Sequence, residues 1–311
     1  MLGRIRALRR AGVVGLNARN AEFIMRWNRR QLYPLVDNKI LSKRRLEEFG
    51  IAVPSLLAAV QTQHEAGHLA ARLQGMDRFV LKPASGSGGD GILVVTAFRN
   101  EAWVTPSGQM LDLDDIQYHV SGILNGMYSL AGQTDEAMFE DLVECDARLR
   151  RLAPEGVPDI RVIVYRGVPV MAMVRLPTRR SGGKANLHQG AIGAGIDMKT
   201  GRTLAAVIES RVVQEHPDTG ESVRDFAIPG WRALLELSAR CHDAVELGYL
   251  GVDIVLDENK GPLVLELNAR PGLAIQIANG SGLGRRTDAV DQAWHADMSL
   301  EERLELAQAL G

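Results

Sequence analysis

The sequence predicts an α+β protein in which helices and strand hairpins alternate along the chain. Apolar residues recur at the helical period in segments that end at glycine, such as residues 231–247, which precede Gly248. Shorter apolar runs come in pairs around turn residues, such as 159–165 and 168–174. The chain has 311 residues, 46% of them hydrophobic, which is enough for two lobes with cores of their own.

The same two patterns predict the remaining elements. In chain order, the helical period covers residues 37–49, 63–74, 114–124 and 300–310, and glycines at 50 and 75 end the first two of these helices. Strands are expected over residues 78–83, 92–96, 138–143, 251–256 and 263–268. Pro83 ends the first of these strands, and a turn over 257–262 joins the last two into a hairpin.

Composition and charge exclude several classes of protein. The net charge is −2, so the chain as a whole offers no cationic field for nucleic acid. The two cysteines, Cys145 and Cys241, stand alone, which excludes a disulfide scaffold and a cysteine zinc site and fits a reducing compartment. No apolar run reaches the roughly 20 residues that span a bilayer, and the N-terminus lacks the apolar core of a secretory signal. We therefore expect a cytoplasmic protein.

The first thirty residues differ from the rest of the chain. They contain eight arginines and one acidic residue, mixed with apolar residues that include Phe23 and Trp27. This composition predicts one or two basic amphipathic helices. The segment either packs on the body with its arginines in solvent, or makes a peripheral contact with an anionic membrane surface or an acidic partner.

Residues 64–68 match the H-E-x-x-H pattern, in which one helix face presents two histidines to zinc and a glutamate acts as base. Thr62 and Glu65 also have the spacing of a capping box, which accounts for the glutamate without metal chemistry. Gly67 weakens the helix by about 1 kcal/mol, and no third ligand is evident at the expected spacing. We therefore favour the capping box, whereas stoichiometric zinc would favour a protease.

Gly86, Gly88 and Gly91 match the pattern G-x-G-x-x-G. The dinucleotide fingerprint requires a helix to begin within such a loop, whereas here the strand 92–96 follows it. A P-loop is excluded as well, because no Gly-Lys-Ser/Thr sequence is present. What remains is a hairpin whose backbone N–H groups can lie over phosphates, or an ordinary hairpin tip. Lys82, just before the loop, favours nucleotide binding.

The last hairpin carries three oxygen ligands. If its turn centres between Asn259 and Lys260, Asp253 lies directly opposite Glu266, and Asn268 shares their face. Two facing carboxylates raise each other's pKa unless a cation lies between them. Ligands of this kind suit Mg²⁺ or Mn²⁺ rather than zinc. The pattern predicts a metal site, and we expect amide substitution of either carboxylate to leave the fold intact, because it relieves their repulsion.

The metal site and the glycine loop together indicate a nucleoside triphosphate. The basic residues that could contact its phosphates are Lys39, Lys82, Arg161, Arg175 and Lys184. Seven short segments, taken in order, then carry a family resemblance; they are residues 38–39, 80–92, 139–144, 159–161, 185–190, 251–254 and 265–272. Over residues 37–283 the chain resembles the ATP-grasp carboxylate–amine ligases, and most of all the RimK-type α-L-glutamate ligases and the bacterial α-L-glutamate ligase-like proteins.

The resemblance implies an ATP-grasp fold of two α+β subdomains that grip ATP, with a short helical N-terminal segment in place of a full pre-ATP domain. Residues 1–36 would be this basic segment, 37–283 the ATP-grasp domain and 284–311 a C-terminal helical tail. Within the ATP-grasp domain, about 79–144 would form the nucleotide lid and about 155–283 the metal-binding and catalytic subdomain.

The resemblance also implies roles for individual positions. ATP phosphates would be held by Lys39 and Lys82. From the residues themselves we expect the glycine loop, at Ser87, Gly88 and Gly89, and Arg175 to contact the nucleotide as well. The backbone of Glu140, Asp141 and Leu142 would read the adenine edge, and Asp159 or Glu144 would contact the ribose. Near the γ-phosphate and the acyl intermediate would lie Arg161, Lys184 and Asn186. Two Mg²⁺ ions would be held by Asp253, Glu266 and Asn268, with Glu266 bridging them. We infer in addition that Arg270 grips a substrate carboxylate.

The implied reaction joins a carboxylate to an amine. The carboxylate of a peptide, protein or small molecule attacks the γ-phosphate to form an acyl phosphate, and an amino acid then displaces phosphate and leaves an amide. An ATP-grasp phosphotransferase and a non-catalytic nucleotide-binding regulatory module are the alternatives.

Two departures from the RimK-type pattern bear on the acceptor. The segment before Lys39 is shorter than in those ligases, so a partner subunit or a second copy of the chain could complete the acceptor site. Residues 145–158 are longer than the matching connection and contain three arginines, which suits either an acceptor-binding insertion or a surface loop.

Overall fold

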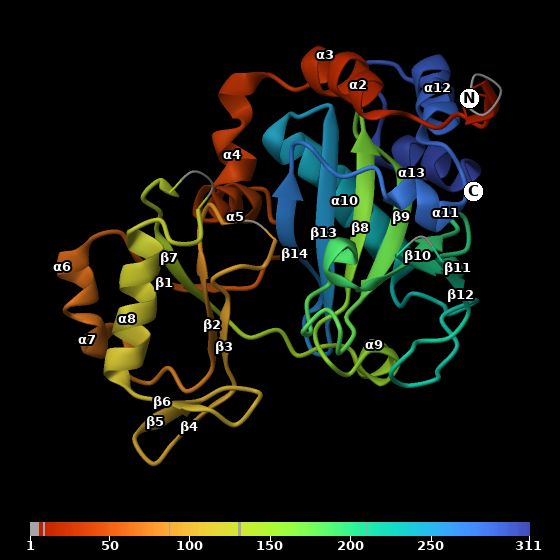
Figure 1. Cartoon of the computed structure of the whole chain (residues 1–311). Coiled ribbons are helices and arrows are strands. Elements are labelled where there is room, and N and C mark those ends of the chain that lie inside the picture. The colour runs from red at the N-terminus through yellow and green to blue at the C-terminus, as the bar shows by residue number, and fades with distance from the viewer. Residues whose placement is uncertain (1–5, 9, 87, 130–131, 210) are drawn as a thin grey trace. The chain divides into compact units, whose positions relative to one another are not determined.

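The computed structural model describes residues 6–8, 10–86, 88–129, 132–209 and 211–311 (Figure 1). These residues form two compact units, each built from more than one stretch of chain. Unit 1 comprises Met1–Asp37, Arg45–Ala52 and Glu144–Gly311, and unit 2 comprises Asn38–Arg44 and Val53–Val143. Both units contain helices and β-strands, so the predicted α+β class is confirmed.

Unit 2 is built on a four-stranded antiparallel sheet in the order β1-β7-β2-β3. Its strands are β1 (Leu56–Val60), β7 (Ala137–Glu140), β2 (Phe79–Pro83) and β3 (Leu93–Val95). A second sheet joins β4 (Ala97–Arg99), β5 (Ala102–Val104) and β6 (Met110–Leu111). Its described helices include α6 (Gln63–Ala66), α7 (Leu69–Leu73) and α8 (Leu113–Leu124), and the first residues of α5 (Lys39–Glu48) also belong to this unit.

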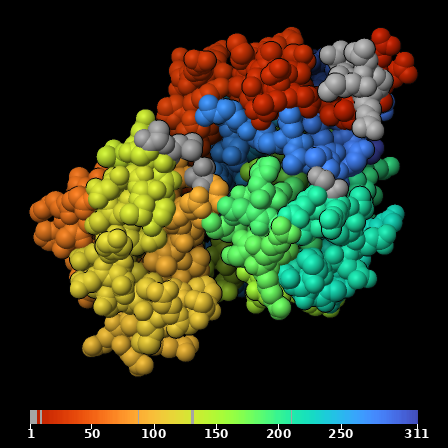
Figure 2. All heavy atoms as spheres, in the orientation of Figure 1, coloured from red at the N-terminus to blue at the C-terminus, as the bar shows by residue number. Residues whose placement is uncertain are grey.

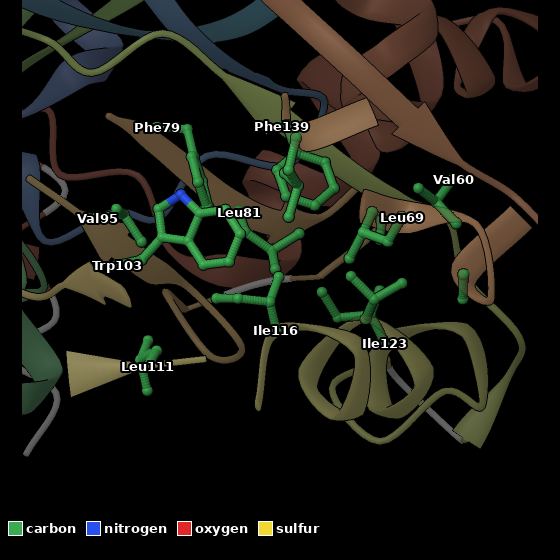
Figure 3. Close-up of a cluster of buried hydrophobic side chains, with 14 of the residues drawn as sticks. Val60, Leu69, Phe79, Leu81, Val95, Trp103, Leu111, Ile116, Ile123 and Phe139 are labelled. Carbon is green, nitrogen blue, oxygen red and sulfur yellow. The ribbon is translucent and has the colours of Figure 1, made fainter. Parts of the chain in front are cut away.

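The core of unit 2 lies between its main sheet and α8 (Figure 3). Phe79 and Phe139 meet edge to face on neighbouring strands, with their ring centroids 5.2 Å apart. Ile116 and Ile123 reach them from α8, where they are seven residues apart and therefore share one helix face. Burial of such side chains is the main favourable term in folding, and it fixes the sheet that carries Lys82 and Glu140.

Two elements of unit 2 are shorter than the sequence predicts. Residues 63–74 form two helices, α6 and α7, rather than one, and the helical path breaks at Gly67 and His68. Low helix propensity at the glycine is the physical reason. The strand predicted over 138–143 ends at Glu140, after which the Asp141 amide donates to the Ser55 carbonyl oxygen at 2.9 Å.

Unit 1 is built on a seven-stranded antiparallel sheet in the order β12-β11-β10-β9-β8-β13-β14. Its strands are β8 (Asp159–Tyr165), β9 (Val168–Leu176), β10 (Ile192–Ile196), β11 (Thr203–Ile208), β12 (Arg211–Val213), β13 (Tyr249–Asp257) and β14 (Gly261–Asn268). Its longer helices are α10 (Trp231–Val245), α12 (Leu283–Ala293) and α13 (Leu300–Ala309), and a shorter one is α11 (Ile275–Asn279). The predicted hairpins over β8–β9 and β13–β14 are confirmed.

The N-terminal segment packs on unit 1. A continuous helical run comprises α2 (Leu16–Ala18), a π-helical stretch (Arg19–Ile24) and α3 (Met25–Trp27). Phe23 contacts Tyr165 at the end of β8 and Tyr249 at the start of β13, with centroid distances of 5.4 and 5.3 Å. Figure 1 shows α2 and α3 at that end of the sheet. The expectation that this segment packs on the body is therefore confirmed.

A 3₁₀ turn (Arg30–Leu32), α4 (Pro34–Asp37) and α5 (Lys39–Glu48) follow the N-terminal run. Farther along, residues 145–158 contain a helix, α9 (Ala147–Leu152). Leu149 and Leu152 are buried, whereas Arg148 and Arg150 are exposed and pair with Asp146 and Glu258, respectively. This segment is therefore packed through one helix face, which a fully solvated loop would not be.

Both cysteines are reduced and buried. Burial in low-dielectric surroundings raises the pKa of the Cys145 thiol to about 11 and raises that of Cys241 as well, because it disfavours the thiolate. In the described part of the chain, no helix combines the length and the apolar character needed to cross a bilayer.

Candidate functional site

The hairpin of β13 and β14 brings the predicted carboxylates together. Asp253 is the register partner of Glu266, and Gly251 is the partner of Asn268, as the sequence predicts. The turn closes one residue earlier than expected, with Asp257 opposite Gly261. A β-bulge then places Leu265 as an extra residue between the pairs Ile254–Val264 and Asp253–Glu266. The bulge cancels the offset of the turn and returns Glu266 to the face of Asp253.

Two arginines of the neighbouring strands contact Asp253. Arg161 on β8 donates two hydrogen bonds to the Asp253 carboxylate, one of them from Nε to Oδ1 at 2.7 Å. Arg175 on β9 donates from Nη2 to Asp253 Oδ2 at 2.9 Å and pairs through both nitrogens with Asp159. The four side chains form a group with no net charge, in which both aspartates are buried and both arginines are partly exposed. Asp159 and Arg161 share one face of β8, as predicted.

The two aspartates of this group have different pKa values. The guanidinium groups of Arg161 and Arg175 outweigh the effect of burial and lower the pKa of Asp253 to about 2. Burial, together with the nearby Asp253 charge, raises the pKa of Asp159 to about 6. The pKa of Asp253 is therefore not set by the expected repulsion from Glu266, because the two guanidinium groups already neutralise the Asp253 carboxylate. The cation that facing carboxylates need is therefore supplied to Asp253 by two arginines, whereas the sequence predicts a metal ion in that role.

The hairpin nevertheless fits a magnesium ion. Its donors are two carboxylates and one side-chain amide, and Mg²⁺ is commonly held by one or two carboxylates together with waters and substrate phosphates. Asn268 lies within reach of the group, because its Nδ2 is 3.3 Å from Asp253 Oδ2. Asp253 Oδ1 accepts a hydrogen bond only from Arg161 among the contacts described, which leaves lone-pair capacity on that oxygen. Among the described residues, no cluster of three or more His, Cys, Asp or Glu side chains has metal-binding geometry.

In unit 2, a buried group of opposite composition surrounds Glu140. Lys82 on β2 and Lys43 on α5 both form ion pairs with the Glu140 carboxylate, at 2.5 and 2.9 Å. All three side chains are buried, so two ammonium groups share one carboxylate and the group carries one excess positive charge. The two lysines overcome the cost of burial and lower the pKa of Glu140. Sequence analysis did not single out Lys43, although it lies one helical turn after Lys39 on the same face.

The glycine loop joins β2 and β3, which pair antiparallel, so the predicted strand–loop–strand arrangement is confirmed. Lys39 Nζ donates to the Gly86 carbonyl oxygen at 2.5 Å, and the Lys39 amide donates to that of Ala84. Gly88 and Gly89 both have positive φ angles, 73° and 80°, which glycine adopts without strain. Ser87, a predicted phosphate ligand, lies outside the described residues.

The other predicted site residues occupy four places. Asp141 and Leu142 follow β7 and are half-buried. The Glu144 amide donates to Asp257 Oδ2 at 2.8 Å, beside the turn of the β13–β14 hairpin. Lys184 and Asn186 lie in the half-buried connection from β9 to β10, where the Asn186 side chain caps a 3₁₀ turn at the His188 amide. Arg270 is exposed after β14, pairs with Asp37 at 3.3 Å and lies over the Tyr33 ring.

The H-E-x-x-H residues form a capping box. The Thr62 side chain accepts from the Glu65 amide, and the Glu65 carboxylate accepts from the Thr62 amide. Glu65 also pairs with Arg72. His68 lies outside α6, which ends at Ala66, but its ring still lies 4.6 Å from that of His64, centroid to centroid. The expectation of a capping box is confirmed.

Comparison with known proteins adds three findings. The family described as sugar-transfer associated ATP-grasp matches residues 18–292. No curated protein matches the chain. The chain also matches solved structures, and those described below share only 14–15% of its sequence.

Three of these solved structures illustrate the likeness. The ATP-grasp ligase PsnB, complexed with a minimal precursor, shares 14% identity with this chain at a TM-score of 0.43. The match covers 91% of this chain and 63% of the PsnB chain. D-alanine–D-alanine ligase from Bacillus anthracis shares 15% identity at a TM-score of 0.46, and the match covers 90% of this chain and 68% of that ligase. A RimK domain ATP-grasp protein from Sphaerobacter thermophilus shares 14% at a TM-score of 0.45, with 83% and 68% covered.

The chain spans only 63% and 60% of the first two structures it matches, which are both of PsnB. The family match, in contrast, extends over most of this chain and includes both of its units. It contains the glycine loop, the group around Glu140 and the β13–β14 hairpin. The protein therefore belongs to the sugar-transfer associated ATP-grasp family.

Proposed function

We propose that the protein is an ATP-dependent carboxylate–amine ligase of the RimK-like, α-L-glutamate ligase-like kind. It would join an amino acid to a carboxylate on a peptide, a protein or a small molecule and release ADP and phosphate. The observation that carries the proposal is the in-register pair of Asp253 and Glu266 with Asn268 on the same face. These are hard oxygen ligands, and Asp253 is paired with the guanidinium groups of Arg161 and Arg175.

Unit 2 would supply the groups that hold the nucleotide. A buried group with one excess positive charge favours an anion, and Lys82 is its member next to the glycine loop. If Lys82 pairs with a phosphate instead of Glu140, Lys43 would still form an ion pair with the Glu140 carboxylate. The positive-φ glycines at 88 and 89 would allow backbone N–H groups to approach phosphate oxygens. The backbone after β7, at Asp141 and Leu142, would read the adenine edge.

Unit 1 would supply the groups for phosphoryl transfer. Asp253, Glu266 and Asn268 would hold Mg²⁺, which neutralises phosphate charge when it is bound. Arg161 and Arg175 would balance the negative charge of the transferring phosphoryl group, with Lys184 and Asn186 near the acyl intermediate. Arg270, on the exposed surface after β14, would hold a substrate carboxylate.

The reaction proceeds in two balanced steps. A carboxylate oxygen of the acceptor attacks the γ-phosphorus, the bond to the β,γ-bridging oxygen breaks, and ADP leaves. The amine nitrogen then attacks the acyl carbon, loses a proton and expels phosphate, so that an amide remains. Water would hydrolyse the acyl phosphate, and the glycine loop is the element that could exclude it.

The test is ADP release with ATP, Mg²⁺, glutamate or another amino acid, and a panel of carboxylate acceptors. A ligase releases ADP only when both acceptor and amine are present, and the product gains the mass of the amino acid. ADP release that needs no amine would instead show a phosphotransferase. Nucleotide binding without ADP release under any of these conditions would favour a regulatory module.

The matched variants are Glu266→Gln and Glu258→Gln. Both remove one carboxylate from the same hairpin, but Glu258 lies at its turn and pairs with Arg150. We expect Glu266→Gln to lower turnover about 100-fold or more, as removal of a charge-stabilising group does in other enzymes. Glu258→Gln should retain turnover. Equal turnover in the two variants would contradict the assignment of Glu266.

A further inference from the structure

The charge of the chain is strongly polarised between its N-terminal segment and the rest. The whole chain has a net charge of −2, but its first thirty residues carry eight arginines and one acidic residue. That segment therefore has a charge of +7, and the remaining 281 residues have a charge of −9. An anionic surface would attract the segment and repel the rest of the chain, so it would hold the protein in one orientation.

The segment also exposes apolar side chains next to its charged ones. Met25 is 75% exposed and Leu16 is 59% exposed, although both belong to the helical run whose Phe23 and Ile24 are buried. Arg26, Arg29 and Arg30 are exposed next to Met25. We call the exposed residues Leu16, Met25, Arg26, Arg29 and Arg30 the basic apolar face.

This face is held in place by the body of unit 1. Asn28 is buried, and its Nδ2 donates to the carbonyl oxygens of Tyr249 and Ala269 at 2.7 and 3.0 Å. Trp27 Nε1 donates to the Tyr165 hydroxyl at 3.0 Å. Figure 2 shows the N-terminal residues in red at the molecular surface. The face is thus already formed, and binding to it would not have to order a flexible segment.

We propose that the basic apolar face docks the protein on a membrane surface that contains anionic lipids. Arginines recognise the anionic headgroups, and the Leu16 and Met25 side chains insert at the boundary of headgroups and acyl chains. The apolar side chains distinguish this partner from a nucleic acid, whose phosphate backbone offers them no apolar contact. The docking is peripheral, because no described helix can span the bilayer.

The test is co-sedimentation of the full chain with phosphatidylcholine vesicles, with and without phosphatidylglycerol. We expect binding to the anionic vesicles alone, and a loss of binding as salt screens the charges. The triple variant Arg26→Gln/Arg29→Gln/Arg30→Gln should bind about 100-fold more weakly, since each basic residue near the surface contributes about fivefold. Leu16→Glu/Met25→Glu should abolish binding.

The matched control is Val212→Glu on β12, whose side chain is 70% exposed on the same unit. It adds an acid at an exposed apolar position outside the face, and binding should persist. All variants are at exposed positions, so their melting temperatures should match that of the parent.

Equal binding to neutral vesicles, no binding at low salt, or an unchanged affinity of the triple variant would overturn the proposal. Binding to a duplex DNA or RNA fragment but not to anionic vesicles would overturn it in favour of a nucleic acid. None of these measurements depends on ligase activity.

Discussion

The Glu140 carboxylate illustrates how one buried residue can hold two others. Lys43 and Lys82 come from different elements, α5 and β2, and both reach the same carboxylate on β7. Removal of the carboxylate would leave two buried ammonium groups side by side, whereas removal of Lys43 would leave a balanced pair. The carboxylate is therefore the member whose loss should cost most stability.

The stability contributed by Glu140 should depend on pH. Its pKa is lowered in the folded state, so its contribution is present above the unfolded pKa of about 4.3 and is lost as pH falls through the folded value. The Glu140→Gln variant has no carboxyl group to titrate at this position. Urea unfolding of parent and variant should therefore show the largest difference in unfolding free energy near neutral pH and a shrinking difference below about pH 4. A difference that stays constant across that range would contradict the role of the charge.

Asp253 and Glu266 should differ in what their amide variants do to stability. Asp253→Asn removes the carboxylate that two arginines share, and loss of one partner of a buried ion pair costs about 3–5 kcal/mol. Glu266 is half-buried, and Glu266→Gln should cost about 1 kcal/mol or less. Urea unfolding measures the loss of unfolding free energy in each variant. Equal losses would show that the two arginines do not need the Asp253 carboxylate as a partner.

This prediction differs from the expectation, drawn from the sequence, that either amide leaves the fold intact. The sequence argument considered only repulsion across the hairpin. The structure adds two arginines, Arg161 and Arg175, which lie 92 and 78 residues before Asp253 in the chain. Glu266 is consequently the position at which loss of activity can be separated from loss of folding.

At the scale of single elements, Gly91 fixes the end of the glycine loop. Its φ is +75°, and a Cβ there would lie 2.5 Å from Cγ of Tyr128. Gly75 has nearly the same φ, +79°, but a Cβ there would meet nothing within 4 Å. Both replacements by alanine incur the left-handed backbone cost of about 1–2 kcal/mol.

Gly91→Ala should cost about 1–3 kcal/mol more than Gly75→Ala, because it also overpacks the Tyr128 ring. Chemical denaturation of the two variants measures the difference in unfolding free energy. Similar stabilities would mean that Tyr128 moves away without cost and that the loop is not held by this contact.

Elements with a strong local pattern were predictable from the sequence, whereas the strands that lie next to them in each sheet were not. The strands of the β13–β14 hairpin follow from alternation and turn residues, and so does the shared face of Asp253 and Glu266. The bulge at Leu265 has no sequence signal, and the correct pairing resulted from two offsets that cancel. Sheet order, which brings β8 beside β13, is set by packing between distant segments.

Sequence reasoning was least successful where a polar residue is buried. Lys43 lies on α5 and is only 3% exposed, although lysine is among the residues least often buried. Its spacing from Lys39, one helical turn, was the available signal. A fold-level resemblance reached Lys82 and Glu140 but not the second lysine that completes their group.

For the whole molecule, ligand binding should appear as a shift in thermal stability. Mg-ATP at about 100 times its Kd stabilises the native state by about 2.7 kcal/mol, which raises Tm by several degrees in a protein of this size. Mg²⁺ alone should give a much smaller shift, because Arg161 and Arg175 already balance Asp253 and nucleotide phosphates would complete the metal's ligands. Thermal melts with each addition measure the two shifts. An equal shift with Mg²⁺ alone would indicate a metal site independent of nucleotide.

The two buried cysteines make the chain suitable for site-specific labelling. Thiolate is the reactive form of cysteine, and burial keeps both native thiols protonated. A maleimide probe should therefore react with cysteines introduced at Tyr118 in unit 2 and Val212 in unit 1, both of which are exposed, while the native thiols remain intact. A spin-label or fluorophore pair at these positions would report how the separation of the two units responds to nucleotide in solution, without prior removal of either native cysteine.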